Sequence, residues 1–205
     1  MPFTFSIREA LKFGWAQTKA HSKVVFQVVL SLFALQVAQA IVQATLPNTL
    51  IGWLAVAALV IAQIVMGIGL TLISLKIAKG QQVSYNDAFP PAKLCWQYLA
   101  ASVLAGFITV LGLILLIIPG IYLALRFSMV RYAVLEGAGI TGSIKKSGKI
   151  TDGVKWQLLG FIIVISLINI VGAMVFMVGL LVTIPVTMIA YAHVYEKLDA
   201  HHHKA

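Results

Sequence analysis

Three long stretches without Asp, Glu, Lys or Arg divide the chain. They run from Val24 to Leu75, from Leu94 to Leu125 and from Trp156 to Tyr195, and contain 52, 32 and 40 residues. A helix needs roughly 20 apolar residues to cross about 30 Å of hydrocarbon. The first and third stretches are therefore long enough for two crossings each, and the second is a tight fit for two.

These stretches predict an all-α integral membrane protein with six transmembrane helices. We expect three hairpins, each preceded by a cytoplasmic interfacial amphipathic segment, in a single polytopic membrane domain over residues 1–205. The predicted spans are 24–46, 50–76, 94–110, 112–133, 156–175 and 178–197. The parts are an interfacial helix (1–23), hairpin 1 (24–76), a cytoplasmic segment (77–93), hairpin 2 (94–133), a basic cytoplasmic segment (134–155), hairpin 3 (156–197) and a tail (198–205).

The distribution of charge orients these spans. The chain has 15 Lys and Arg against 6 Asp and Glu, a net charge of +9, and the basic residues lie before, between and after the three stretches. The turns expected at 46–48, 109–112 and 176–179 carry no charge. The positive-inside rule then predicts both termini in the cytoplasm. Because this rule explains the basic residues, we expect anionic lipid headgroups rather than nucleic acid as their partners.

The second hairpin permits two interpretations. If Pro119 and Gly120 formed the outer turn, Arg126 and Arg131 would lie deep in the bilayer, where a charge costs about 2.5–3.5 kcal/mol. If the turn lies near Gly112, proline kinks the fourth span internally and Arg126 stays near the cytoplasmic interface, where its stem can snorkel. We favour the second interpretation.

Two glycine–proline segments indicate an internal repeat. Gly112 lies seven residues before Pro119, and Gly179 lies six before Pro185, so the fourth and sixth spans read alike. We predict three degenerate repeat units, with helix kinks at Pro119, Gly120 and Pro185.

The segments before the hairpins carry helix-start and amphipathic signals. A serine followed three residues later by an acid, the form of a capping box, occurs at Ser6 and again at Ser84. At 100° per residue the first segment separates an apolar face from a basic one, which is typical of a helix lying in the membrane interface. The alternative is a helix that docks on a partner protein. The apolar face holds Phe3, Ile7, Leu11, Gly14 and Thr18, and the basic face holds Arg8, Lys12, Lys19 and Lys23.

Polar residues inside the predicted spans form one candidate path. Gln36, Gln39 and Gln43 follow one face of the first span, with Gln63 and Asn169 as candidate partners on other spans. The stripe could line a path for a solute or a lipid headgroup. We favour the alternative, in which these residues form interhelical hydrogen bonds worth about 0.6 kcal/mol each.

Basic residues near the end of the fourth span are candidate contacts for lipid phosphate or for a partner. Arginine binds phosphate through a planar fork, although an anchoring role for this cluster with Glu136 is the simpler interpretation. The candidates are Arg126, Arg131, Lys145, Lys146 and Lys149.

The sequence lacks the residues expected of an enzyme. All six acidic residues are expected on the cytoplasmic side, so no carboxylate pair lies within the membrane, and no His-Glu-x-x-His motif occurs. The tract at 201–203 has three histidines but no Cys, Asp or Glu at a spacing that completes a metal site. We expect no cofactor and no metal.

The residues from Leu115 to Tyr122 (Leu-Leu-Ile-Ile-Pro-Gly-Ile-Tyr), followed by Arg126 and Glu136, resemble a known family. With Gly153 to Trp156 and the C-terminal Ile184-Pro185, they are similar to the uncharacterised YciC-like six-span family of bacterial inner-membrane proteins. They also resemble the membrane domain fused to some glycerophosphodiester phosphodiesterases. The resemblance implies the fold and a bacterial cytoplasmic membrane, and it carries over no catalytic residue, because the phosphodiesterase chemistry belongs to a separate soluble domain.

Together these features indicate a non-enzymatic membrane protein. We expect a scaffold or an assembly or envelope factor whose basic cytoplasmic face contacts anionic lipid, with a protein partner or a homo-oligomer left open. The alternative is a passive carrier or lipid-handling protein that uses a polar path through the bundle.

Overall fold

The computed structural model describes residues 5–174 and 178–202, and within these ranges it contains helices and no strand. Six segments are long and apolar enough to cross a membrane, which confirms an all-helical, multi-pass membrane protein. They are Ser22–Thr45, Leu50–Ala78, Ala92–Leu115, Ile117–Leu135, Lys155–Met174 and Gly179–His202.

The helices α2, α3, α4, α8 and α9 are long, and shorter elements fill the connections between them. In chain order the elements are α1 (Ile7–Ala20), α2 (Ser22–Thr45), α3 (Leu50–Ala78), the 3-10 helix η1 (Tyr85–Ala88), α4 (Ala92–Leu115), α5 (Ile117–Phe127), α6 (Val130–Leu135), α7 (Gly139–Ile150), α8 (Lys155–Met174) and α9 (Val178–His202).

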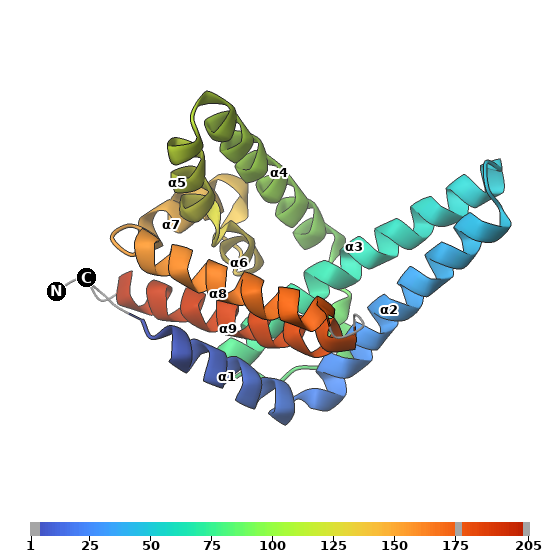
Figure 1. Cartoon of the computed structure of the whole chain (residues 1–205), viewed down its shortest axis with the longest axis horizontal. Coiled ribbons are helices and arrows are strands. Elements are labelled where there is room, and N and C mark those ends of the chain that lie inside the picture. Colours follow the sequence, from blue (N-terminus) through green and yellow to red (C-terminus); the bar gives the residue numbers. More distant parts are fainter. Residues whose placement is uncertain (1–4, 175–177, 203–205) are drawn as a thin grey trace.

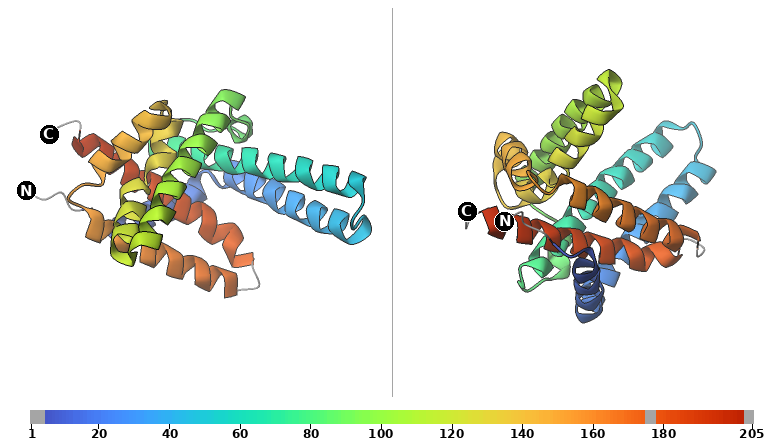
Figure 2. Two further views of the ribbon diagram at one scale, coloured as in Figure 1. Left: turned by 90° about the horizontal axis from the view of Figure 1, so that it is seen from above. Right: turned by 60° about the vertical axis from the view of Figure 1, so that its left-hand side comes forward.

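Three pairs of consecutive helices diverge from a common base. Helix α2 packs against α3, α4 against α5, and α8 against α9. The α2–α3 and α4–α5 pairs project away from the rest of the molecule, whereas α1 lies along α9 (Figures 1 and 2).

The buried core lies in the base and not in the projecting pairs. Large side chains that are almost fully buried include Tyr195, Phe161 and Met129, which come from α9, α8 and the start of α6. At the outer ends Leu50 is 75% exposed and Ile118 is 83% exposed. Because these segments are long and apolar enough to span a membrane, we expect their exposed apolar side chains to face the hydrocarbon of the bilayer.

Helix α1 docks on α9 through small side chains. Its buried residues are Ala10, Gly14 and Thr18, and a Cβ on Gly14 would lie 2.4 Å from the carbonyl oxygen of Val186. Small residues of this kind allow two helix backbones to approach closely. Gly14, a member of the predicted apolar face, therefore packs against α9, and Thr18 of the same face is buried. Phe3, the first member, lies outside the described residues.

Replacing Gly14 by leucine should separate α1 from α9, because the close contact with α9 leaves no room for a side chain. We expect a loss of roughly 1–3 kcal/mol, the usual cost of overpacking. Thermal unfolding in detergent measures this loss. Ala16 is exposed on the same helix, so Ala16→Leu is the matched control, and equal effects of the two changes would contradict the docking.

The structure corrects the predicted turn of the second hairpin. Helix α4 continues past Gly112, and the chain turns at Leu116, whose backbone is extended (φ −161°, ψ 141°). Pro119 is then the third residue of α5 and does not kink the fourth span, since the first N–H groups of a helix have no intrahelical acceptor to lose. Gly120 serves close packing, because a Cβ there would clash with Leu113 of α4.

The two glycine–proline segments are not structurally equivalent. Gly112 lies near the end of α4, whereas Gly179 lies at the start of α9, the second helix of its pair. Pro185 lies in the interior of α9, whereas Pro119 lies in the first turn of α5. Residues 176 and 177 of the turn predicted at 176–179 lie outside the described residues, and 178 and 179 begin α9.

A capping box orders the connection between α3 and α4, as the sequence predicts. The Ser84 backbone N–H donates to the Asp87 carboxylate at 2.9 Å, and the Ser84 side chain caps η1 in return. Asp87 also pairs with Lys76 of α3 at 2.6 Å. This segment therefore folds back onto the end of α3.

Candidate functional site: a polar cavity beside the broken fourth span

The fourth candidate span is a broken helix. Helix α5 ends at Phe127 and α6 begins at Val130, and the break is held by Ser147 of α7. The Ser147 hydroxyl donates to the carbonyl of Arg126 at 2.7 Å and accepts from the backbone N–H of Met129 at 3.3 Å. Irregular backbone at membrane depth occurs where it is buried in protein or lines a cavity, and here Ser147 is fully buried.

A cavity of about 630 Å³ lies beside this break. Its volume falls within the usual range for small-molecule sites, roughly 300–1,000 Å³. Side chains from α3, α4, α5, α6, α8 and α9 line it, together with the break, and all of them belong to candidate membrane spans. The polar members of the lining are Thr71, Ser102, Thr109, Ser128, Arg131, Tyr132, Asn169, Thr187 and Tyr191.

Arg131 supplies the charge in this lining. It lies four residues before the end of the fourth candidate span, Ile117–Leu135, and no carboxylate among the described residues forms an ion pair with it. A charged side chain within a span is costly, and it marks a functional site when it faces a cavity. The cavity therefore offers a guanidinium without a carboxylate partner among the described residues to an anionic ligand.

Two further polar atoms of the lining have no partner among the described residues. The Ser102 hydroxyl and the Asn169 Oδ1 are buried and make no hydrogen bond. The Asn169 amide nitrogen donates to the Thr187 hydroxyl at 3.4 Å, which orients the side chain. Buried polar groups in native proteins are almost always satisfied, so this wall is suited to polar atoms of a ligand or to water.

The structure separates the residues of the predicted glutamine path. The Gln63 amide donates to Gln39 Oε1 at 2.9 Å, so these two side chains join α3 to α2. Gln36 and Gln43 lie exposed on α2. Asn169 lines the cavity on α8, and none of the four glutamines does. The favoured interpretation of the stripe, interhelical hydrogen bonding, describes Gln39 and Gln63.

The predicted phosphate contacts also separate. All four of Arg126, Arg131, Lys145 and Lys149 are exposed, but Arg131 alone among them lines the cavity. Lys146 is half-buried and holds two carboxylates, Glu136 at 2.6 Å and Asp199 at 2.9 Å. Its ammonium group is therefore engaged by carboxylates of the protein itself.

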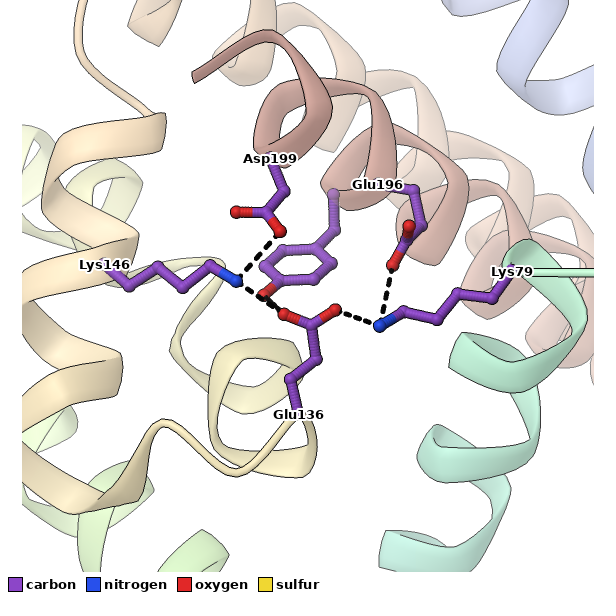
Figure 3. Close-up of polar contacts among 6 residues, drawn as sticks. Lys79, Glu136, Lys146, Glu196 and Asp199 are labelled. Carbon is purple, nitrogen blue, oxygen red and sulfur yellow. Dashed lines mark hydrogen bonds and ion pairs between the residues drawn. The ribbon is translucent and has the colours of Figure 1, made fainter. Parts of the chain in front are cut away.

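A charged cluster joins four helices at the base (Figure 3). Glu136, which ends α6, pairs with Lys146 of α7 and with Lys79 at the end of α3, and it accepts a hydrogen bond from the Tyr195 hydroxyl of α9. Lys79 also lies 3.5 Å from the Glu196 carboxylate. We call Lys79, Glu136, Lys146, Tyr195, Glu196 and Asp199 the base cluster.

Glu136 is the centre of the base cluster. Burial alone would raise its pKa, but hydrogen bonds from Lys146, Lys79 and Tyr195 outweigh burial and lower the pKa from 4.5 to about 2. Burial opposes the charge on Lys79 and Lys146 as well, and the bonds to Glu136 raise both pKa values above the usual 10.5. All three groups therefore stay charged across the physiological range, and the cluster is suited to holding helices together.

Within the described ranges, no three His, Cys, Asp or Glu side chains gather as metal ligands do. His201 and His202 lie in the last turn of α9, and His203 lies outside those ranges.

Comparison with known protein families, with characterised proteins and with solved structures found no match. The chemistry of the cavity is therefore inferred from the residues that line it.

Proposed function

We propose that this chain is a non-enzymatic membrane protein that binds an anionic phospholipid in the cavity beside its broken fourth span. The observation that carries the proposal is Arg131, which lies in a candidate span, lines a cavity of about 630 Å³ and has no carboxylate partner in the part of the chain that the structure describes. This function corresponds to a lipid-handling protein rather than to a scaffold.

The lining matches the two ends of an amphiphile. Arg131 can bind a phosphate through its planar fork, and the Ser102 hydroxyl and the Asn169 amide add polar groups that lack partners among the described residues. Ala105, Val110 and other apolar side chains of the same wall suit the hydrocarbon end. A net negative headgroup is favoured because it neutralises the charge of Arg131, an exposed side chain that forms no ion pair with a described carboxylate.

The setting of the proposal is the bacterial cytoplasmic membrane, with both termini in the cytoplasm. The basic residues between the spans support this orientation through the positive-inside rule, and the resemblance to the YciC-like family supports the membrane. The exposed Lys145 and Lys149 of α7 are suited to the anionic surface of the cytoplasmic leaflet.

Filling the cavity should displace the lipid without unfolding the protein. Gly106 lines the cavity, and a Cβ built there meets no atom within 4 Å. Native mass spectrometry of wild-type protein, extracted gently from its own membrane, should show the added mass of an anionic lipid. In Gly106→Leu the lipid-bound fraction should be at least ten-fold lower. Gly67 is also helical with open space around it but lies outside the cavity, so Gly67→Leu should retain the lipid.

Two results would contradict the proposal. One is a wild-type protein without a bound lipid mass, and the other is an equal loss from both glycine variants. A co-purifying protein at fixed stoichiometry, with no lipid, would instead favour the scaffold.

A further inference from the structure

Helix α2 has an outer face that the rest of the described chain does not cover, and we call four exposed residues on it the stripe. Phe33, Gln36, Ala40 and Gln43 are all exposed on α2. Neither Gln36 nor Gln43 makes a side-chain hydrogen bond to a described residue, whereas Gln39 is paired with Gln63 of α3. Two amides of the stripe therefore remain open on the outside of the pair.

Hydrocarbon is a poor surrounding for the amide of Gln36, the more central of the two. Helix α2 is a candidate span of 24 residues, and Gln36 is its fifteenth, so this side chain lies near mid-membrane. Lipid chains offer no hydrogen-bond donor or acceptor, and burying an unpaired amide in an apolar medium costs several kcal/mol. A protein surface with amides at the same depth would satisfy both groups.

The spacing of the stripe specifies the kind of partner. Its four residues are separated by three, four and three positions, which is the seam along which two helices pack side by side. An amide is both donor and acceptor, so identical glutamines facing each other satisfy one another. Ala40 lies between them and allows close approach of two backbones.

We propose that a second copy of this chain packs along α2, with Gln36 and Gln43 of each copy facing the same residues of the other. Both copies insert with the same orientation, so their α2 helices run parallel, and a symmetric contact places equal depths opposite each other. Buried polar residues in such seams set register and partner number. The inference is independent of the lipid proposed for the cavity.

Cysteine cross-linking in membranes tests this contact. The chain has a single cysteine, Cys95, so Cys95→Ala provides a background for Gln36→Cys and Gln43→Cys. Ile41 is exposed on the same helix but lies roughly a third of a turn from the seam at 100° per residue, and Ile41→Cys is the matched control. We expect oxidation to give disulfide-linked dimers at both seam positions at least five-fold faster than at Ile41.

Counting subunits tests the role of the amides. Photobleaching of labelled protein in vesicles should show dimers, and Gln36→Leu with Gln43→Leu should weaken the dimer several-fold, whereas Ile41→Leu should not. Equal cross-linking on both faces, or single subunits at every protein density, would overturn the proposal and leave lipid as the neighbour of α2. Cross-links formed only to a different protein in native membranes would also overturn it.

Discussion

Replacing Glu136 by alanine should destabilise the protein by about 3 kcal/mol. The carboxylate is 11% exposed and joins Lys79 of α3 to Lys146 of α7 while accepting a bond from Tyr195 of α9. Removing one partner from a largely buried ion pair typically costs about 3–5 kcal/mol, because the remaining charges lose their compensation. The lower end applies here, since both lysines are about a quarter exposed. Unfolding by denaturant in detergent measures the change.

The pH dependence of the protein's stability tests the same role of the Glu136 carboxylate. The pKa of Glu136 is lowered in the folded protein from 4.5 to about 2, so its contribution is fully present above pH 4.5 and is lost as the pH falls towards 2. We expect wild type to lose stability through this window, and Glu136→Gln to lose correspondingly less. Asp152, paired with Lys155 but exposed, provides the control Asp152→Asn. Equal effects of the Asp152 and Glu136 variants would contradict the role of the base cluster.

Replacing Arg131 by glutamine should weaken lipid binding roughly 10- to 100-fold. Hydrogen bonds to a charged group contribute about 1.5–3 kcal/mol, and each 1.4 kcal/mol is a factor of ten in affinity. Titration of delipidated protein with phosphatidylglycerol, followed by native mass spectrometry, measures this loss. A zwitterionic phospholipid has no net negative charge to neutralise Arg131. It should bind to wild type more weakly than phosphatidylglycerol does, and Arg131→Gln should reduce its affinity less.

The same substitution should leave stability unchanged or raise it. Arg131 forms no ion pair with a described carboxylate and lies within a candidate span, so removing its charge relieves an insertion cost. A residue with a purely structural role would show the opposite. Arg126→Gln, outside the cavity, is the matched control. Equal lipid affinities of the two variants would contradict the assignment of Arg131.

Local features were predictable from the sequence, and the turn of the second hairpin was not. Absence of charge over long stretches identified the six candidate spans, and the spacing of Ser84 and Asp87 identified a cap that the structure contains. The chain turns at Leu116 within the apolar run from Leu115 to Ile118. Because no polar residue or glycine marks this point, the pattern favoured the nearby Gly112.

The base cluster and the cavity depend on contacts between distant segments. Glu136 was recognisable as a charge near a span end, but Lys79 lies 57 residues before it and Tyr195 lies 59 residues after it. The break after Phe127 is held by Ser147, which comes from α7, about 20 residues further along the chain. Arg131 was a candidate contact, yet only the packing of α4, α6 and α8 shows that it faces a cavity.

Photo-cross-linking of lipid in native membranes tests the central proposal most directly. A phosphatidylglycerol analogue with a photoreactive group near its headgroup should label peptides from the cavity wall, at 102–110 of α4 and 165–169 of α8. Labelling there should fall with Arg131→Gln and remain with Arg126→Gln. Labelling confined to the bare outer ends of the helices, and unaffected by either arginine, would contradict a lipid site in the cavity.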